Sequence, residues 1–138
     1  TEQAASDPIF APGVFKVLPN EVGGLVTTLP EEVPGQLALL IGRYEGGPRA
    51  FEDIVDLHYR FERIHPFQDG NGRIGRMVLF KECLRNGVLP FIVPDDRKHF
   101  YYRGLANYED EPGWLLDTCR AFQDDFAARF LPLVPHLA

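Results

Sequence analysis

Cysteine, methionine and tryptophan are scarce in this sequence of 138 residues, which has two cysteines, one methionine and one tryptophan. Cys83 and Cys119 lie in separate stretches that we expect to be helical, and neither belongs to a short Cys/His pattern of the kind that holds zinc. So little cysteine also argues against a small secreted domain held together by disulfides. We therefore expect both residues to be buried thiols in a reducing compartment.

Long apolar runs are absent as well. No hydrophobic stretch approaches the roughly 20 residues that a membrane-spanning helix needs, and no signal peptide is visible. The first residue is Thr1 and not methionine, which suggests a processed chain or a piece of a longer one. We expect no membrane contact and, by default, the bacterial cytoplasm, with delivery into a host cell left open.

Basic residues are in deficit. The chain has 14 lysines and arginines against 20 acidic residues, for a net charge of −6. Non-specific binding to nucleic acid depends on many Lys and Arg contacts with phosphates, so we expect no nucleic-acid partner. A few arginines in an acidic chain can still focus a small anionic ligand into a local cleft.

The remaining pattern is mainly helical, and we expect one domain, 1–138. Proline-containing residues 1–12 form an irregular lead-in. A hairpin is expected over 13–26, with extended pieces at 13–18 and 22–26 on either side of a turn at Pro19-Asn20. A helical core follows over 28–130, with helices near 30–44, 48–64, 72–85, 95–105 and 112–130, and then a tail, 131–138.

Apolar periodicity predicts which helix faces are buried. In 30–44 the stripe is Leu37, Leu40, Ile41 and Tyr44. In 72–85 apolar residues lie on several sides, which predicts a central helix buried among its neighbours. His58, on the apolar stripe of 48–64, is expected to be a hydrogen-bonded core residue, because it lies two helical turns from His65 and cannot share one metal ion with it.

Between two of these helices lies a stretch that combines a histidine, a carboxylate, small residues and two arginines, His65-Pro66-Phe67-Gln68-Asp69-Gly70-Asn71-Gly72-Arg73-Ile74-Gly75-Arg76. The free N–H groups and the dipole at the start of the second helix favour an anion. Two arginines three residues apart lie on one face of that helix and suit a polyphosphate. A carboxylate beside phosphates makes sense if Mg²⁺ bridges them, since Mg²⁺ is typically held by one or two carboxylates plus substrate phosphates. His65 is mostly neutral near pH 7 and can accept a proton, and Pro66 favours extended geometry at His65.

This stretch resembles the signature of the Fic family, H-P-F-x-[DE]-G-N-G-R-x-x-R, and matches it at every defined position. The resemblance implies a Fic-type helical bundle around a buried central helix with a small N-terminal hairpin, the flap. It also implies a protein adenylyltransferase, which transfers AMP from Mg·ATP to a Ser, Thr or Tyr hydroxyl of a target protein and releases pyrophosphate.

The resemblance also assigns roles. His65 would be the general base and Asp69 the Mg²⁺ ligand. The anion cradle would be Gly70, Asn71 and Gly72, with Arg73 and Arg76 on the β- and γ-phosphates of ATP. Tyr102 would form a wall of the adenine pocket, and the target protein would pair in β-fashion with the flap near Lys16–Leu18.

Many members of the family inhibit themselves with a helix that carries [S/T]-x-x-x-E-[G/N], and no such motif is present in this chain. The resemblance therefore implies that an inhibitory segment or an antitoxin-like partner lies outside these residues. We expect Arg76 to be free to bind the γ-phosphate.

Two other interpretations remain open. The motif constrains the diphosphate cradle more than the group attached to it, so the donor could be another diphosphate compound, or the reaction could remove AMP from a target. An interpretation of another class is a non-catalytic module that senses nucleotide, for which His65 would be dispensable.

Overall fold

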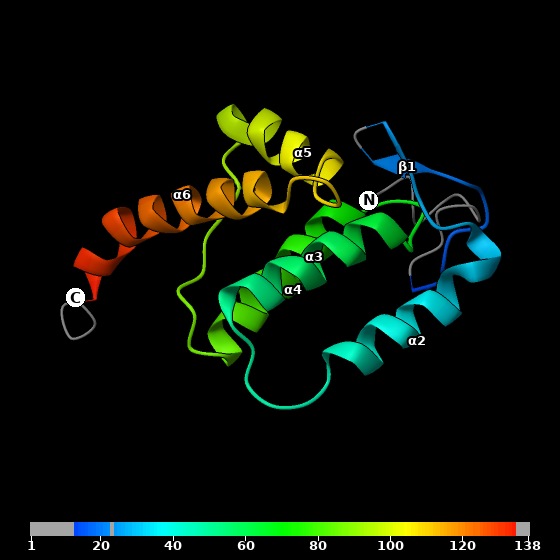
Figure 1. Ribbon diagram of the computed structural model, residues 1–138, viewed down its shortest axis with the longest axis horizontal. Helices are drawn as coiled ribbons and strands as arrows, with labels where there is room; N and C mark the ends of the chain where they lie inside the picture. Colours follow the sequence, from blue (N-terminus) through cyan, green and yellow to red (C-terminus); the bar gives the residue numbers. More distant parts are fainter. Residues whose placement is uncertain (1–12, 23, 135–138) are drawn as a thin grey trace. The chain divides into compact units, whose positions relative to one another are not determined.

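A computed structural model describes residues 13–22 and 24–134, which form a mainly helical fold with one small hairpin (Figure 1). The α-helices are α2 (Val33–Tyr44), α3 (Phe51–Ile64), α4 (Asn71–Arg85), α5 (Lys98–Ala106) and α6 (Pro112–Phe130). The strands are β1 (Glu21–Val22) and β2 (Leu25–Val26), and the 3-10 turns are η2 (Pro30–Glu32), η3 (Asp95–Arg97) and η4 (Leu131–Leu133). The predicted fold class is confirmed, whereas the predicted lead-in, 1–12, lies outside the described residues.

The chain divides into two compact units. The first comprises Thr1–Gly47 and Leu57–Met77, and the second comprises Pro48–Asp56 and Val78–Ala138. The whole stretch from His65 to Arg76 therefore lies in the first unit, together with the hairpin and α2.

The hairpin turns at a different place from the one predicted. Its antiparallel register pairs Glu21 with Val26 and Val22 with Leu25. Both strands therefore lie at the second predicted strand, and residues 13–18 form no ladder. The turn predicted at Pro19-Asn20 comes later, where Gly24 adopts a φ of 81° that glycine tolerates.

The apolar stripe predicted for α2 is not a buried face. Val33 is the one buried residue of the helix, Leu37 and Leu40 are half-buried, and Ile41 is exposed. Periodicity shows which residues share a face of a helix, but it does not show whether a neighbour covers that face.

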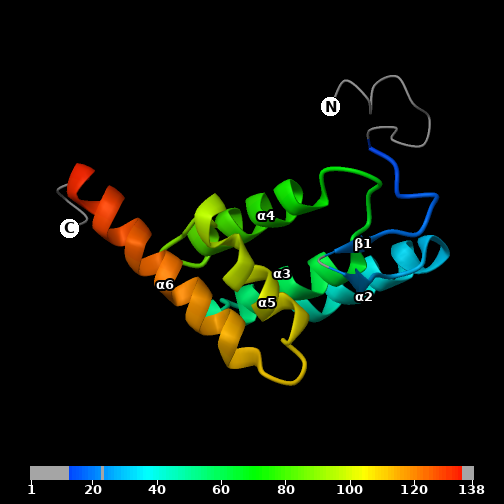
Figure 2. The same cartoon turned by 90° about the horizontal axis from the view of Figure 1, so that it is seen from above.

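The helices α3 and α4 run side by side (Figures 1 and 2), and His58 joins them within the first unit. Its Nδ1 lies 3.2 Å from the carbonyl oxygen of Gly75, and its side chain is buried, so the prediction of a core histidine is confirmed. The prediction for α4 needs correction, because its buried face is made of small and polar residues together with Leu79 and Cys83. Met77 is 71% exposed, so α4 is not surrounded on all sides.

The second unit is built on the pair α5 and α6, which pack against each other. Gly104 permits this approach, since a Cβ there would lie 2.8 Å from the Cα of Leu115. Cys83 and Cys119 are both buried free thiols, as predicted. Burial raises the pKa of Cys83 to about 11 and that of Cys119 to about 12, so neither is a reactive thiolate near pH 7.

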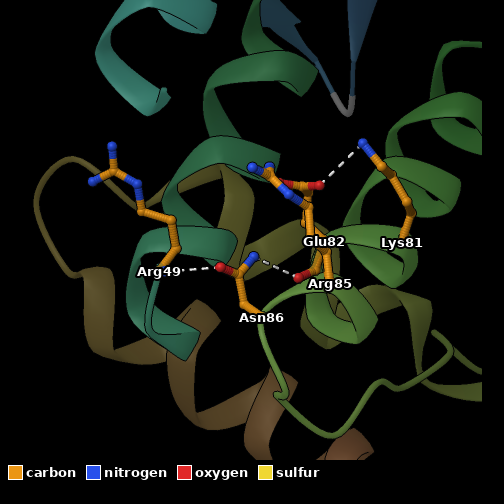
Figure 3. Close-up of polar contacts among 5 residues, drawn as sticks. All are labelled: Arg49, Lys81, Glu82, Arg85 and Asn86. Atoms are coloured by element: carbon orange, nitrogen blue, oxygen red, sulfur yellow. Dashed lines mark hydrogen bonds and ion pairs between the residues drawn. The ribbon is translucent and has the colours of Figure 1, made fainter. Parts of the chain in front are cut away.

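The C-terminal end of α4 is held to the start of the second unit by Asn86 (Figure 3). Its Oδ1 accepts a hydrogen bond from the backbone N–H of Arg49 at 2.8 Å, and its Nδ2 donates to the carbonyl of Glu82 at 2.8 Å. The buried carboxylate of Glu82 forms ion pairs with Lys81 and Arg85. These contacts hold the C-terminal end of the helix whose N-terminal end is the predicted anion site.

Candidate active site

The helix α3 ends in a left-handed residue, His65, whose φ is 49°. Its N–H donates to the carbonyl of Phe61 at 3.0 Å, which is the single hydrogen bond of an αL helix cap. The prediction of extended geometry ahead of Pro66 was therefore wrong, because the helix cap outweighs the proline effect. Left-handed non-glycine residues cost free energy and persist where the surroundings fix them.

Lys16 makes many of the contacts that hold the backbone on both sides of His65. Its side chain is 3% exposed, and its Nζ donates to the carbonyl of Ile64 at 3.2 Å, to Asn20 Oδ1 at 2.6 Å and to Thr27 Oγ1 at 3.0 Å. Its backbone N–H donates to the carbonyl of Pro66 at 2.8 Å. A cation at the C-terminal end of α3 also complements the helix dipole. Lys16 thus ties the segment before the hairpin to the residues on both sides of His65.

The same lysine acts on the protonation of His65. Burial is the main cause that lowers the pKa of His65, and the positive charge of Lys16 lowers it further, while the nearby carbonyl of Glu62 raises it. The Nδ1 of His65 is buried and makes no hydrogen bond to the described residues. Because its pKa lies below the ordinary value of 6.5, His65 is neutral at pH 7 and can accept a proton.

Asn71 shapes the loop that follows. Its side chain is buried, with Oδ1 accepting from the N–H of Phe67 at 2.8 Å and Nδ2 donating to the carbonyl of Phe67 at 2.6 Å. Asn20 donates to the same carbonyl at 3.0 Å. The side chain of Asn71 is therefore occupied in holding the loop, and only its backbone N–H can serve an anion.

The first turn of α4 keeps part of the predicted anion cradle. The N–H of Gly70 donates to Asp69 Oδ1 at 2.8 Å, so it serves the turn, where Gly70 has a φ of 81°. The N–H of Ile74 donates to the carbonyl of Gly70 at 3.0 Å. The N–H groups of Asn71, Gly72 and Arg73 come before that first helical bond and have no intrahelical acceptor.

Both arginine side chains extend back over this first turn. A Cβ on Gly72 would lie 2.9 Å from Nη1 of Arg76, and a Cβ on Gly70 would lie 3.5 Å from Nη2 of Arg73. The absence of a side chain on Gly72 therefore makes room for the guanidinium of Arg76, whereas Gly70 lies at ordinary contact distance from that of Arg73. The structure brings both arginines to the end of α4 that carries the free N–H groups, as the sequence predicted.

Gln68 joins this loop to the segment before the hairpin. Its Oε1 accepts from the N–H groups of Val17 and Leu18, both at 3.1 Å, and its Nε2 donates to the carbonyl of Leu18 at 3.2 Å. With the N–H of Lys16 bonded to Pro66, all three donors of 16–18 are used inside the chain. A target strand cannot pair with these N–H groups unless the bonds to Gln68 and Pro66 break, and the Lys16 side chain is not accessible.

Replacing Gln68 by alanine should release that segment. We expect the amide protons of Val17 and Leu18 to exchange roughly fivefold faster, because each loses its acceptor and a hydrogen bond is worth about 1 kcal/mol. Hydrogen-exchange NMR measures this directly. Replacing Gln123, whose Nε2 donates to the carbonyl of Leu89 in the second unit, is the matched control. Unchanged exchange at Val17 and Leu18 in Gln68→Ala would contradict the conclusion that Gln68 holds this segment in place.

Tyr102 belongs to α5 in the second unit, where it is partly exposed and its ring lies 5.4 Å from that of Tyr101. Its role at adenine stays a prediction.

The described residues contain no group of three or more His, Cys, Asp or Glu side chains that could hold a metal ion by themselves. In the same part of the chain, every helix is too short or too polar to cross a membrane.

The sequence argument missed Gln68 and Glu62, and it named Lys16 only as part of the segment on which a target docks. Lys16 is the single charged residue of an apolar stretch, and Glu62 follows His58 by four positions on the apolar side of α3. Both are signals of a buried charge with a specific partner. Gln68 occupies the first undefined position of the motif, and nothing in the local pattern distinguishes it.

Comparison with known proteins agrees with this geometry. Residues 3–82 match the family model of the Fic/DOC family. A protein adenylyltransferase Fic of Culex quinquefasciatus is 35% identical over 104 residues, which is 70% of this chain and 20% of the relative. One of Drosophila erecta is 38% identical over 88 residues, which is 56% of this chain and 18% of the relative.

The chain spans about a fifth of the length of these curated relatives. Among solved structures, a Fic domain-containing signaling protein of Bacteroides thetaiotaomicron VPI-5482 superposes with a TM-score of 0.64 at 29% identity, over 84% of this chain and 50% of that one. With the motif, the fold and the family match in agreement, the chain belongs to the Fic/DOC family.

Proposed function

We propose that this chain is a protein adenylyltransferase, which transfers AMP from ATP to a hydroxyl of a target protein. The observation that carries the proposal is the arrangement in the first unit, where one histidine, kept neutral, follows α3 while two arginines extend over the open first turn of α4. The names of the relatives support the same activity.

His65 would act as the general base. It takes the proton of the target hydroxyl, the oxygen attacks the α-phosphorus of ATP, and the bond from that phosphorus to the bridging oxygen of the β-phosphate breaks. Pyrophosphate leaves, and AMP remains on the target oxygen. The lowered pKa of His65 suits this role, because the imidazole is unprotonated at neutral pH.

The start of α4 would hold the phosphates. The free N–H groups of Asn71, Gly72 and Arg73 present a positive helix end to an anion. Arg73 and Arg76 supply two guanidinium groups for the β- and γ-phosphates, where charge-assisted hydrogen bonds are strong. Gly70 contributes the left-handed turn that leads into the helix, and not its N–H.

Asp69 fits a Mg²⁺ ion that is shared with the nucleotide. It is an exposed carboxylate at the entrance to the anion site, and Mg²⁺ is commonly held by one or two carboxylates plus substrate phosphates. When bound, Mg²⁺ would neutralise charge on the departing pyrophosphate.

Target docking would use the exposed side chains around the hairpin. Val17, Leu18 and Val26 are apolar and exposed, whereas the N–H donors of 16–18 are already occupied. We therefore place the protein partner on these side chains. Separately, Tyr102 remains the proposed wall of the adenine pocket. Inhibition would come from a segment or an antitoxin-like partner outside these residues.

Labelled ATP tests the proposal. The protein is incubated with a cell lysate and Mg²⁺ plus ATP labelled at either the α- or the γ-phosphate. We expect the α-label to appear on protein and the γ-label in free pyrophosphate. A γ-label on protein would indicate phosphoryl transfer instead, and protein-bound label from neither nucleotide would contradict the proposed activity.

A further inference from the structure

Glu62 is a buried carboxylate that the proposed mechanism does not use. Its side chain, on α3, is 3% exposed, and its Oε1 makes no hydrogen bond to the described residues. Carboxylates are almost never buried unless they are paired. The position therefore requires an explanation beyond packing.

Glu62 lies against the backbone of α4. A Cβ on Gly75 would lie 2.1 Å from Oε1 of Glu62, and the ring of Phe61 would be 3.2 Å away. Only a glycine leaves room for the carboxylate here. The carboxylate therefore approaches α4 one residue before Arg76.

Arg76 is the charge that Glu62 meets. Burial raises the pKa of Glu62 to about 7, and the guanidinium of Arg76 opposes that rise. For buried His58, burial is the largest cause that lowers the pKa to about 4, and Arg76 adds to it. Arg76 thus lies within electrostatic reach of both groups.

No direct ion pair joins Glu62 to Arg76 in the described part of the chain. The Nη1 of Arg76 instead reaches the space beside Gly72, at the anion-binding end of α4. The guanidinium therefore stays available to a ligand while it remains under the attraction of a buried negative charge.

We propose that Glu62 is a positioning residue for Arg76: its carboxylate holds the guanidinium near the first turn of α4 and takes up a proton when a polyphosphate engages that guanidinium. The proposal rests on the proposed function, in which Arg76 binds the γ-phosphate. The proton comes from solvent, and no bond other than this O–H bond is formed.

The sign of the pH effect follows from the charges. A bound phosphate neutralises Arg76, which removes the attraction that favours ionised Glu62, so the pKa of Glu62 rises above about 7. Proton uptake on binding means that affinity falls as the pH increases from about 7. If binding raises this pKa by about one pH unit, affinity falls roughly fivefold between pH 7 and pH 9. His58 and His65 are both neutral throughout that range.

Calorimetric titration of Mg·ATP in buffers of different ionisation enthalpy measures both effects. We expect the wild-type protein to take up a fraction of a proton at pH 7.5 and Glu62→Gln, which keeps the shape, to take up markedly less. Glu82→Gln removes another buried glutamate, in the second unit, and should behave as wild type. Equal proton uptake in the wild-type protein and Glu62→Gln would overturn the proposal.

A second measurement does not depend on catalysis. Carboxyl NMR of the ligand-free protein follows the titration of Glu62, and Arg76→Gln should raise its pKa. An unchanged value would overturn the positioning role even if AMP transfer occurs. A raised value in a protein that binds no Mg·ATP would leave the Glu62–Arg76 coupling standing and would count against the proposed function.

Discussion

Replacing His65 by alanine should lower the rate of AMP transfer by about 10³-fold and leave the affinity for Mg·ATP within roughly twofold. General base catalysis contributes about 10²–10⁴-fold, and an alanine side chain has no atom that can accept the proton. The proposed nucleotide contacts lie instead on the first turn of α4, which His65→Ala leaves intact. Transfer of α-label to protein and calorimetric binding of Mg·ATP measure the two quantities separately.

The matched control is His99→Ala, which removes an exposed histidine of α5 in the second unit and should change neither quantity. Parallel loss of transfer and of nucleotide binding in His65→Ala would assign His65 to binding or folding. Full transfer without His65 would show that another group is the base. No transfer by either protein, with equal binding of Mg·ATP, would leave the nucleotide-sensing interpretation as the better one. His65→Ala thus shows whether His65 acts as the base, is needed for nucleotide binding or folding, or has no role in transfer.

The sequence predicted how the groups of the candidate site are arranged where these groups are neighbours along the chain. The stretch from His65 to Arg76 forms the end of one helix, a loop and the start of the next, so its spacing determines which groups meet. Arg73 and Arg76 reach the same helix end because residues three apart share a face and side chains lean toward the N-terminus. The placement of the groups around this one turn could therefore be predicted, and their roles stay predictions.

What the sequence could not predict depends on distant contacts. Lys16 bonds to Ile64, and Gln68 bonds to Val17 and Leu18, across separations of 48 to 51 residues. No periodicity encodes such pairs. The backbone conformation of His65 was predicted wrongly for a related reason. The proline rule considers only the next residue, whereas the helix cap at His65 is fixed by its bond to Phe61 and by the contacts of Lys16 on both sides of it.

Replacing Lys16 by methionine should lower the free energy of unfolding by about 2–3 kcal/mol. Methionine fills similar space but donates no hydrogen bond, so the acceptors on Ile64, Asn20 and Thr27 lose a buried partner. A buried polar atom left unsatisfied costs about 1–3 kcal/mol, and the relief of a desolvated charge offsets part of that loss. Urea unfolding measures the change, and Lys98→Met, at an ion pair with the exposed Asp95, should cost less than about 1 kcal/mol.

The same substitution should also move the pH dependence of transfer. Burial lowers the pKa of His65 first, and the positive charge of Lys16 lowers it further, so Lys16→Met should raise that pKa toward 6.5. A general base works only when it is unprotonated, and transfer therefore fails as the pH falls through the pKa of His65. In Lys16→Met this fall should occur at a higher pH than in the wild-type protein. A folded variant with reduced stability and an unshifted acid limb would confine Lys16 to a structural role, whereas a shifted limb shows that the buried lysine also keeps the base neutral.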